Sequence, residues 1–201
     1  MLVQNPGGSP VHVDFTLNTG GGEVKPPELQ HVEIGAGSRR TFLLNAYVTT
    51  TDVSTRVSCT DGLVACERAM YWRPGAGVPW AVGHNGTGVY RSNPVWYLPE
   101  GATDLGFESY VLVQNPGGSP VHVDFTLNTG VGEVKPPELQ HVEIGAGSRR
   151  TFNLGNYVKT TDVSTKVLCR DGRVICERAV YWRPSPGSPW TVGHDSRGIS
   201  P

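Results

Sequence analysis

The chain contains nearly the same sequence twice. Residues 2–84 recur as residues 112–194, with 15 differences in 83 aligned positions and a constant offset of 110. A repeat of this length is the size of a small domain with its own core, whereas a solenoid repeat is shorter and needs its neighbours. We therefore predict two similar domains in series, residues 1–95 and 96–201. Such a pair is more typical of a structural or binding array than of one active site.

Composition excludes several classes of protein. The net charge is -1 and only 17% of the residues are charged, so there is no bulk electrostatic basis for binding nucleic acid or an acidic membrane. No apolar run reaches the roughly 18–20 residues that cross a bilayer, so no membrane insertion is expected. The first residues have no basic start and no long apolar stretch, and we expect the export signal of a longer secreted protein to lie elsewhere.

Strand patterns dominate both copies. Residues 121–128 and their twin 11–18 alternate strictly between apolar and polar side chains, which indicates half-buried strands. The 26 glycines and 16 prolines fit many tight turns, and no segment has a sustained helical period. The sequence therefore predicts an all-β protein of two tandem immunoglobulin-like antiparallel β-sandwiches. Further strands in the second copy are expected at 108–114, 139–144, 149–154, 162–169 and 174–182.

One cysteine pair occurs in each copy, Cys59 with Cys66 and Cys169 with Cys176. Seven-residue spacing is poor for zinc, which favours closer ligand pairs. We predict one disulfide per domain, which implies an oxidising, extracellular setting; free buried thiols are the alternative. The Asp61-Gly62 dipeptide suggests a hairpin with a wide loop over residues 60–65 and the two cysteines facing each other.

Several short phrases follow one another in a characteristic order. In the second copy the phrases are Trp96–Gly101, Gly106–Tyr110, Asn115-Pro116, Asp162–Thr165, Glu177–Trp182 and Gly193-His194. Together they resemble a repeat domain of unknown function from bacterial surface and secreted proteins. The resemblance implies an all-β module, used in tandem beside catalytic or anchoring regions, and it implies no activity. The cysteine pairs are not part of this resemblance.

Charged residues interrupt one apolar strand in each copy. Because Glu67-Arg68 and Glu177-Arg178 lie within it, their charges must reach a partner or the rim of the sandwich. We interpret all four as members of structural ion pairs, with sugar contact as the alternative. His194-Asp195-Ser196 contains the letters of a hydrolytic triad, but consecutive side chains diverge and cannot form one. No catalytic, metal or cofactor site is predicted.

Two tryptophans follow proline-rich loops. Trp80 and Trp190 could stack on a sugar ring or anchor a protein partner, although such residues more often cap the end of a core. These residues are the candidate contacts for the second functional hypothesis, a carbohydrate- or protein-binding adhesion module. The leading hypothesis is a non-catalytic extracellular structural or assembly module, such as a spacer, a stalk or a filament-forming unit.

One segment occurs only once. Residues 96–111 precede the second copy, and this sequence has no equivalent before Leu2. If the segment belongs to the second domain, the first lacks a strand and exposes an edge at residues 2–4 or beside them. If it closes the first domain instead, the second lacks its own closing segment. An unpaired edge is a template for strand addition. We therefore expect neighbouring repeats or further copies of the chain as partners, with possible glycan contact.

Overall fold

The computed structural model describes residues 1–49, 52–73, 77 and 82–201. We call the part formed by the first eight strands unit 1 and the part formed by the other nine unit 2. Unit 1 contains β1 (Leu2–Gln4), β2 (Val11–Thr19), β3 (Gly22–Val24), β4 (Val32–Ile34), β5 (Arg39–Thr41), β6 (Val53–Cys59), β7 (Ala65–Trp72) and β8 (Val82–Thr87). Unit 2 contains β9 (Val95–Leu98), β10 (Phe107–Gln114), β11 (Val121–Thr129), β12 (Gly132–Val134), β13 (Val142–Ile144), β14 (Arg149–Asn153), β15 (Val163–Cys169), β16 (Ile175–Trp182) and β17 (Val192–Arg197).

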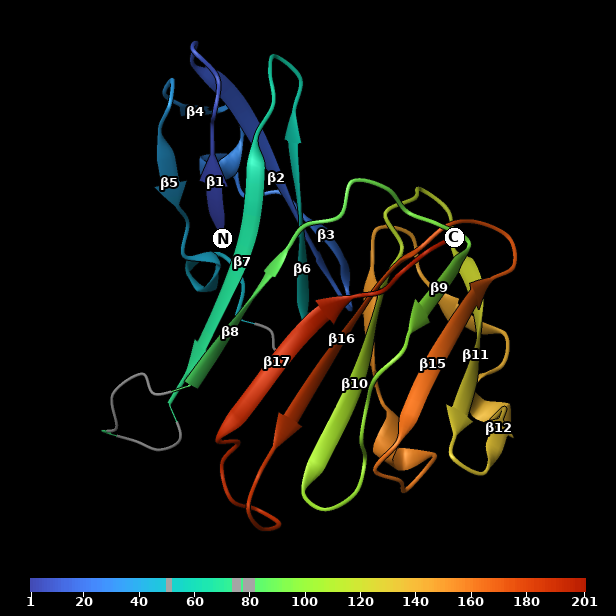
Figure 1. The fold of residues 1–201 in the computed structure, drawn as a ribbon. Helices are drawn as coiled ribbons and strands as arrows, with labels where there is room; N and C mark the ends of the chain where they lie inside the picture. The colour runs from blue at the N-terminus through green and yellow to red at the C-terminus, as the bar shows by residue number, and fades with distance from the viewer. Residues whose placement is uncertain (50–51, 74–76, 78–81) are drawn as a thin grey trace.

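Four antiparallel sheets are present, and each is built from strands of one unit. Unit 1 has the sheet β5-β1-β7-β8 and a second sheet in which β2 pairs with β3, β4 and β6. Unit 2 repeats this plan with β14-β10-β16-β17 and with β12-β11-β15-β9, where β13 also pairs with β11. Figure 1 shows the two units next to each other, with β8 and β17 side by side between them. The predicted all-β sandwich is confirmed.

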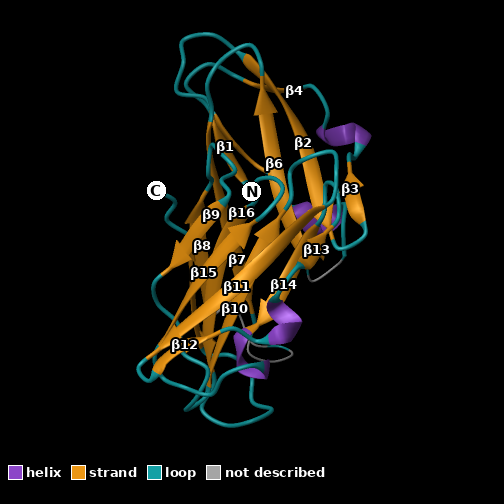
Figure 2. Cartoon of the chain, turned by 90° about the vertical axis from the view of Figure 1, so that its right-hand side faces the viewer, coloured by secondary structure: helices purple, strands orange, loops and turns teal. Residues whose placement is uncertain are grey.

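Strand alternation builds the core. The odd-numbered residues of β11, from Val121 to Leu127, are buried against the opposite sheet, as the period of two requires. The strand predicted at 174–182 lies between β10 and β17 and is buried on both faces along much of its length. Outside the strands, the described residues form loops and four single-turn 3-10 helices (Figure 2). They span Pro27–Leu29, Leu44–Ala46, Pro137–Leu139 and Leu154–Asn156. In the described part of the chain no helix is long and apolar enough to span a bilayer.

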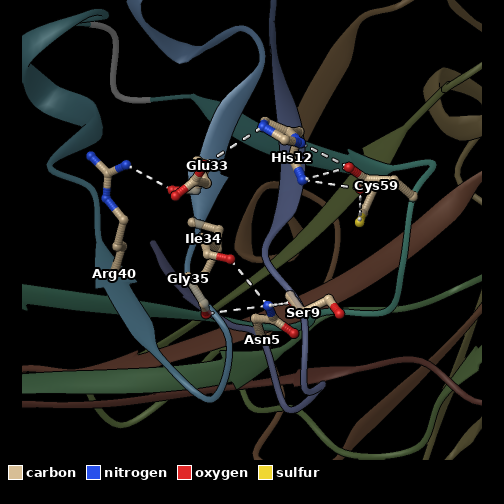
Figure 3. Close-up of polar contacts among 9 residues, drawn as sticks. Asn5, Ser9, His12, Glu33, Ile34, Gly35, Arg40 and Cys59 are labelled. Carbon is tan, nitrogen blue, oxygen red and sulfur yellow. Dashed lines mark hydrogen bonds and ion pairs between the residues drawn. The ribbon is translucent and has the colours of Figure 1, made fainter.

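The Asn-Pro-Gly-Gly phrase has a structural role. The side chain of Asn5 is fully buried, and its Nδ2 donates to the carbonyl oxygens of Ser9, Ile34 and Gly35 at 2.8, 3.0 and 3.2 Å (Figure 3). One amide thus satisfies the backbone of two neighbouring turns, which would otherwise leave buried carbonyls unpaired. Asn115 makes the same three contacts in unit 2.

The cysteine loop differs from its prediction. β6 and β7 do not form a hairpin, because β6 belongs to the β2 sheet and β7 to the β1 sheet. The residues between them cross from one sheet to the other, which the Asp-Gly turn signal does not distinguish from a hairpin. All four cysteines (Cys59, Cys66, Cys169 and Cys176) are free thiols in the structure. The predicted disulfides are therefore absent from it.

The leading segment joins unit 2. β9 pairs with β15, and β10 pairs with both β14 and β16. The edge expected at Leu2–Gln4 is absent, because β1 pairs with β5 on one side and with β7 on the other. β1 is shorter than β10, however, and reaches only residues 65–67 of β7. Among the described strands, β6 pairs with β2 alone, whereas its equivalent β15 pairs with both β11 and β9, so β6 is an edge strand of unit 1 and the leading segment covers the equivalent edge in unit 2.

Candidate functional site

The most elaborate arrangement of polar side chains lies where the two units meet. Along β16, the even-numbered Cys176 and Arg178 face the core of unit 2. The odd-numbered Glu177 and Tyr181 therefore face outward. The same alternation turns Arg68 on β7 toward the inner side of its own sheet. The outer face of the β16 sheet therefore packs against an inner-face stretch of the β7–β8 hairpin. We call this contact the unit contact.

A charged cluster occupies its centre. Arg68 donates from Nη1 to Glu177 Oε2 at 2.9 Å and from Nη2 to Glu177 Oε1 at 2.7 Å, and Nη2 also contacts Asp195. His84 Nδ1 lies 2.7 Å from Asp195 Oδ1. The side chain of Asp195 is 0% exposed and that of His84 is 5% exposed, so this pair is shielded from water, while Arg68 and Glu177 are partly buried. A bidentate arginine–carboxylate pair of this kind fixes the relative orientation of the two side chains as well as contributing energy.

Burial and charge move the pKa values of the two carboxylic acids in opposite directions. Burial raises the pKa of Glu177, and its hydrogen bond with Asp195 adds to this although the charge of Arg68 opposes it. Burial also acts to raise the pKa of Asp195. Hydrogen bonds with His84 and Glu177 and the charge of Arg68 outweigh that effect, so the pKa of Asp195 lies well below its ordinary value. The cluster therefore favours the charged form of Asp195 and disfavours that of Glu177.

Aromatic rings extend the contact beyond the charges. Trp72 Nε1 donates to the backbone carbonyl of Trp190 at 3.0 Å, and the Trp72 ring meets Tyr181 edge-on with centroids 5.6 Å apart. Trp190 stacks on Tyr181 at 4.7 Å and lies under the guanidinium of Arg183. The Tyr181 hydroxyl is 3.3 Å from His84 Nε2. Trp190 thus packs into the unit contact; Trp80 lies outside the described residues.

A second group of contacts ties β2 to the turn before β14. Asn18 Nδ2 donates to the carbonyl of Gly147 at 2.6 Å, and Gln114 Nε2 donates to Asn18 Oδ1 at 2.8 Å. Asp52 accepts from Arg149 Nη1 at 2.8 Å and from Thr151 Oγ1 at 2.6 Å. Asn18 and Arg149 are buried, while their equivalents in the other unit, Asn128 and Arg39, are exposed. Residues at equivalent positions are therefore buried in the contact in one unit and exposed to solvent in the other.

The inner-face residues of unit 1 have equivalents that hold a different partner in unit 2. Arg178 donates to the backbone carbonyl of Glu100 at 2.6 Å and pairs with its carboxylate. Trp182 Nε1 donates to the carbonyl of Leu105 at 3.1 Å, and His194 lies 3.6 Å from the Glu100 carboxylate. In unit 2 these three side chains hold the leading segment. Their equivalents in unit 1, Arg68, Trp72 and His84, hold unit 2.

Sequence reasoning reached part of this cluster. It named Arg68 and Glu177 as ion-pair residues, and the structure joins these two across the unit contact. Glu67 instead accepts a hydrogen bond from Asn85 on the outer face of unit 1. His84 and Asp195 were missed as partners. The available signal was the difference between His84-Asn85 and His194-Asp195, which gives a carboxylate to the second copy alone.

A stacked histidine pair recurs in both units. His12 stacks on His31 with centroids 4.1 Å apart, and His12 Nδ1 lies 2.8 Å from Asp61 Oδ2 (His12 is labelled in Figure 3). Hydrogen bonds from the backbone and the ring of His12 lower the pKa of Asp61 to about 2. His122, His141 and Asp171 repeat the arrangement. Within the described ranges, no group of three or more histidine, cysteine, aspartate or glutamate residues is placed to hold a metal ion.

The outer face of unit 1 remains open. A shallow hollow of about 370 Å³ lies there, over β7 and β8. Its lining includes Glu67, Ala69 and Tyr71, the equivalents of Glu177, Ala179 and Tyr181, which unit 1 covers in unit 2. Tyr71 is 67% exposed. Unit 1 therefore presents the kind of surface that unit 2 uses in the unit contact, with Asn85 at the position of Asp195.

Comparisons with known proteins give limited matches. The chain is similar to the crystal structure of Thermotoga maritima 1070, with 14% identity, a TM-score of 0.47, and coverage of 56% of this chain and 97% of that one. It is also similar to the Anabaena sensory rhodopsin transducer, with 15% identity, a TM-score of 0.38, and coverage of 45% and 99%. No curated protein matches the sequence. A family model matches residues 92–177, from just before β9 into β16, and it describes a family of unknown function (DUF5719).

Proposed function

We propose that the chain is a non-catalytic extracellular structural or assembly module of a bacterial surface or secreted protein, acting as a spacer, stalk or filament-forming unit. The observation that carries this proposal is the unit contact. Arg68, Glu177 and Asp195 form a shielded network between repeats, where a flexible linker would leave the repeats free to move. A network that fixes one repeat on the next suits a part whose task is to hold a spacing.

The open outer face of unit 1 supports an array. Its Glu67 and Tyr71 repeat the residues through which unit 2 receives the inner face of unit 1. A further repeat can therefore add in the same head-to-tail manner, and a contact of this type propagates instead of closing. The extracellular setting is proposed from the resemblance to repeats of bacterial surface and secreted proteins.

Small-angle X-ray scattering tests the spacer role. The scattering curve of the full chain should fit one fixed arrangement of the two units, unchanged between low and moderate salt. An Asp195→Asn variant should loosen it and increase the radius of gyration, whereas Asp104→Asn, outside the unit contact, should not. A wild-type curve that fits only a broad ensemble of unit arrangements would refute the proposal.

A carbohydrate- or protein-binding adhesion module is the second candidate. The hollow on unit 1 favours it, because the exposed ring of Tyr71 lies beside Glu67 and Asn85, groups that can stack on and hydrogen-bond a sugar. A glycan array separates the two candidates. Saturable binding that is lost in Tyr71→Ala and kept in Tyr90→Ala, another exposed tyrosine, would favour adhesion over the purely structural role.

A further inference from the structure

The core of unit 1 is less completely covered than the core of unit 2. In unit 2, Val167, Cys169, Val174 and Cys176 are at most 3% exposed. Their equivalents in unit 1, which are the same residue types, are only partly buried. We call these equivalents the open flank: Val57, Cys59, Val64 and Cys66. Because the residue types are identical, the difference in exposure comes from their neighbours.

In unit 2 the neighbour is the start of the leading segment. β9 pairs with β15, placing Trp96 opposite Val167 and Leu98 opposite Thr165. Trp96 is 3% exposed and Leu98 is 1% exposed. Trp96 Nε1 donates to the carbonyl of Val174 at 2.7 Å, so the ring is fixed by a hydrogen bond as well as by packing. Residues 93–98 therefore close this side of the sandwich.

The backbone of unit 2 receives this segment at further points. Asn93 exchanges two hydrogen bonds with Val174, at 2.9 and 3.0 Å, and Cys169 N donates to the carbonyl of Pro94 at 2.7 Å. In unit 1 the equivalent strand, β6, pairs with β2 alone among the described strands. An edge of this kind, beside a partly exposed apolar flank, is a template for an added strand.

We propose that the open flank binds the leading segment of another repeat of this type, a peptide with the sequence of residues 92–99. It adds antiparallel to β6, with its tryptophan over Val57 and its indole N–H directed to the carbonyl of Val64. This inference rests on the proposed function, since it names the partner through which such modules assemble. A longer segment, through residue 106, reaches Arg68 and Trp72 and competes there with unit 2.

Binding of a synthetic peptide to the full chain tests the proposal. The peptide carries residues 92–99 (Ser-Asn-Pro-Val-Trp-Tyr-Leu-Pro) with a fluorescent label, and fluorescence anisotropy measures its affinity. The control peptide carries Trp96→Ala. We expect saturable binding, at least tenfold weaker for the control, because the tryptophan supplies most of the apolar area. Hydrogen–deuterium exchange should then show new protection over residues 53–59 and 64–66.

The possible results divide clearly. No binding at millimolar peptide, equal binding of the two peptides, or new protection on β15 instead of β6 would each overturn the proposal. Binding with protection on β6 supports it. The proposed structural role is tested independently by solution scattering, because a fixed arrangement of the two units does not depend on peptide binding.

Discussion

Replacing Arg68 by alanine should weaken the unit contact severely. The change removes the one guanidinium that pairs with both Glu177 and Asp195. Side-chain exposure is 22% for Arg68, 26% for Glu177 and 0% for Asp195, so water cannot fully replace the lost partner. Removing one member of a buried ion pair typically costs about 3–5 kcal/mol, which is about two to four orders of magnitude in an equilibrium constant.

Urea unfolding followed by tryptophan fluorescence measures this cost. Arg178→Ala is the matched control, because it removes the equivalent arginine from a pair whose carboxylate, on Glu100, is 58% exposed and stays hydrated. The Arg68 variant should lose clearly more free energy of unfolding than the control. Adding Glu177→Gln and Asp195→Asn to Arg68→Ala should recover much of the loss, since no unpaired carboxylate then remains buried.

A small effect would contradict this reasoning. Exposed ion pairs contribute about 0.2–1 kcal/mol. If Arg68→Ala costs no more than that, or if the triple variant is no more stable than the single one, the cluster is hydrated in solution and does not hold the units together.

Four further outcomes are expected. Arg149→Ala should lower the free energy of unfolding by about 1.5–3 kcal/mol, because it breaks the hydrogen bond to Asp52. Arg39→Ala, at the exposed equivalent position, should change that free energy by no more than about 0.5 kcal/mol in the same assay. Burial raises the pKa of all four thiols, most strongly that of Cys176. Peptide mapping after timed alkylation should therefore find Cys176 modified slowest and the partly exposed cysteines of unit 1 fastest. Equal alkylation rates would contradict this difference in burial. The folded pKa of Glu177 is raised above its ordinary 4.5, so its stabilising contribution is complete below pH 4.5 and is lost as the pH rises through the folded pKa. The free energy of unfolding should therefore increase as the pH falls toward 4.5, and Glu177→Gln should abolish that increase. The contribution of Asp195 has the opposite sign, because its pKa is lowered from 3.8: it is present above that pH and lost as the pH falls further, so unfolding measured below pH 3.8 should show a steep decline that Asp195→Asn lacks.

Strands with a marked apolar pattern were predictable, and β9 and β17 were not. β11 follows from its period of two, β16 from its apolar residues on both faces, and the strands expected at 108–114, 149–154 and 162–169 are β10, β14 and β15. β17 contains Gly193, His194, Asp195 and Ser196, and it is a strand because it pairs along β16, not because of its own composition. β9 is only four residues long, too short for a period to be visible. Pairing with a strong neighbour decides such segments, and the sequence alone does not contain that neighbour's position.

The candidate site was predictable only in its parts. An arginine inside an apolar strand needs a partner for its charge, which was the basis for interpreting Arg68 and Arg178 as ion-pair residues. The structure pairs Arg68 with Glu177 and Arg178 with Glu100. The identity of the partner was hidden, because the two arginines share the same local sequence and yet reach different acids. The disulfide prediction assumed a hairpin, whereas Cys59 ends β6 in one sheet and Cys66 lies on β7 in the other, and both are free thiols in the structure.

The two units show how one sequence supports two kinds of contact. Arg, Trp and His on the inner face of β7–β8, or of β16–β17, present a guanidinium, an indole N–H and an imidazole at fixed spacing. In unit 2 they are satisfied by a carboxylate and a carbonyl of the leading segment, and in unit 1 by carboxylates and a carbonyl of unit 2. The acceptors come from unrelated parts of the chain, so what the inner face recognises is a chemical pattern and not one sequence. A repeat built this way can be completed by its own leading segment or by the next repeat, and this choice allows such modules to be joined in series.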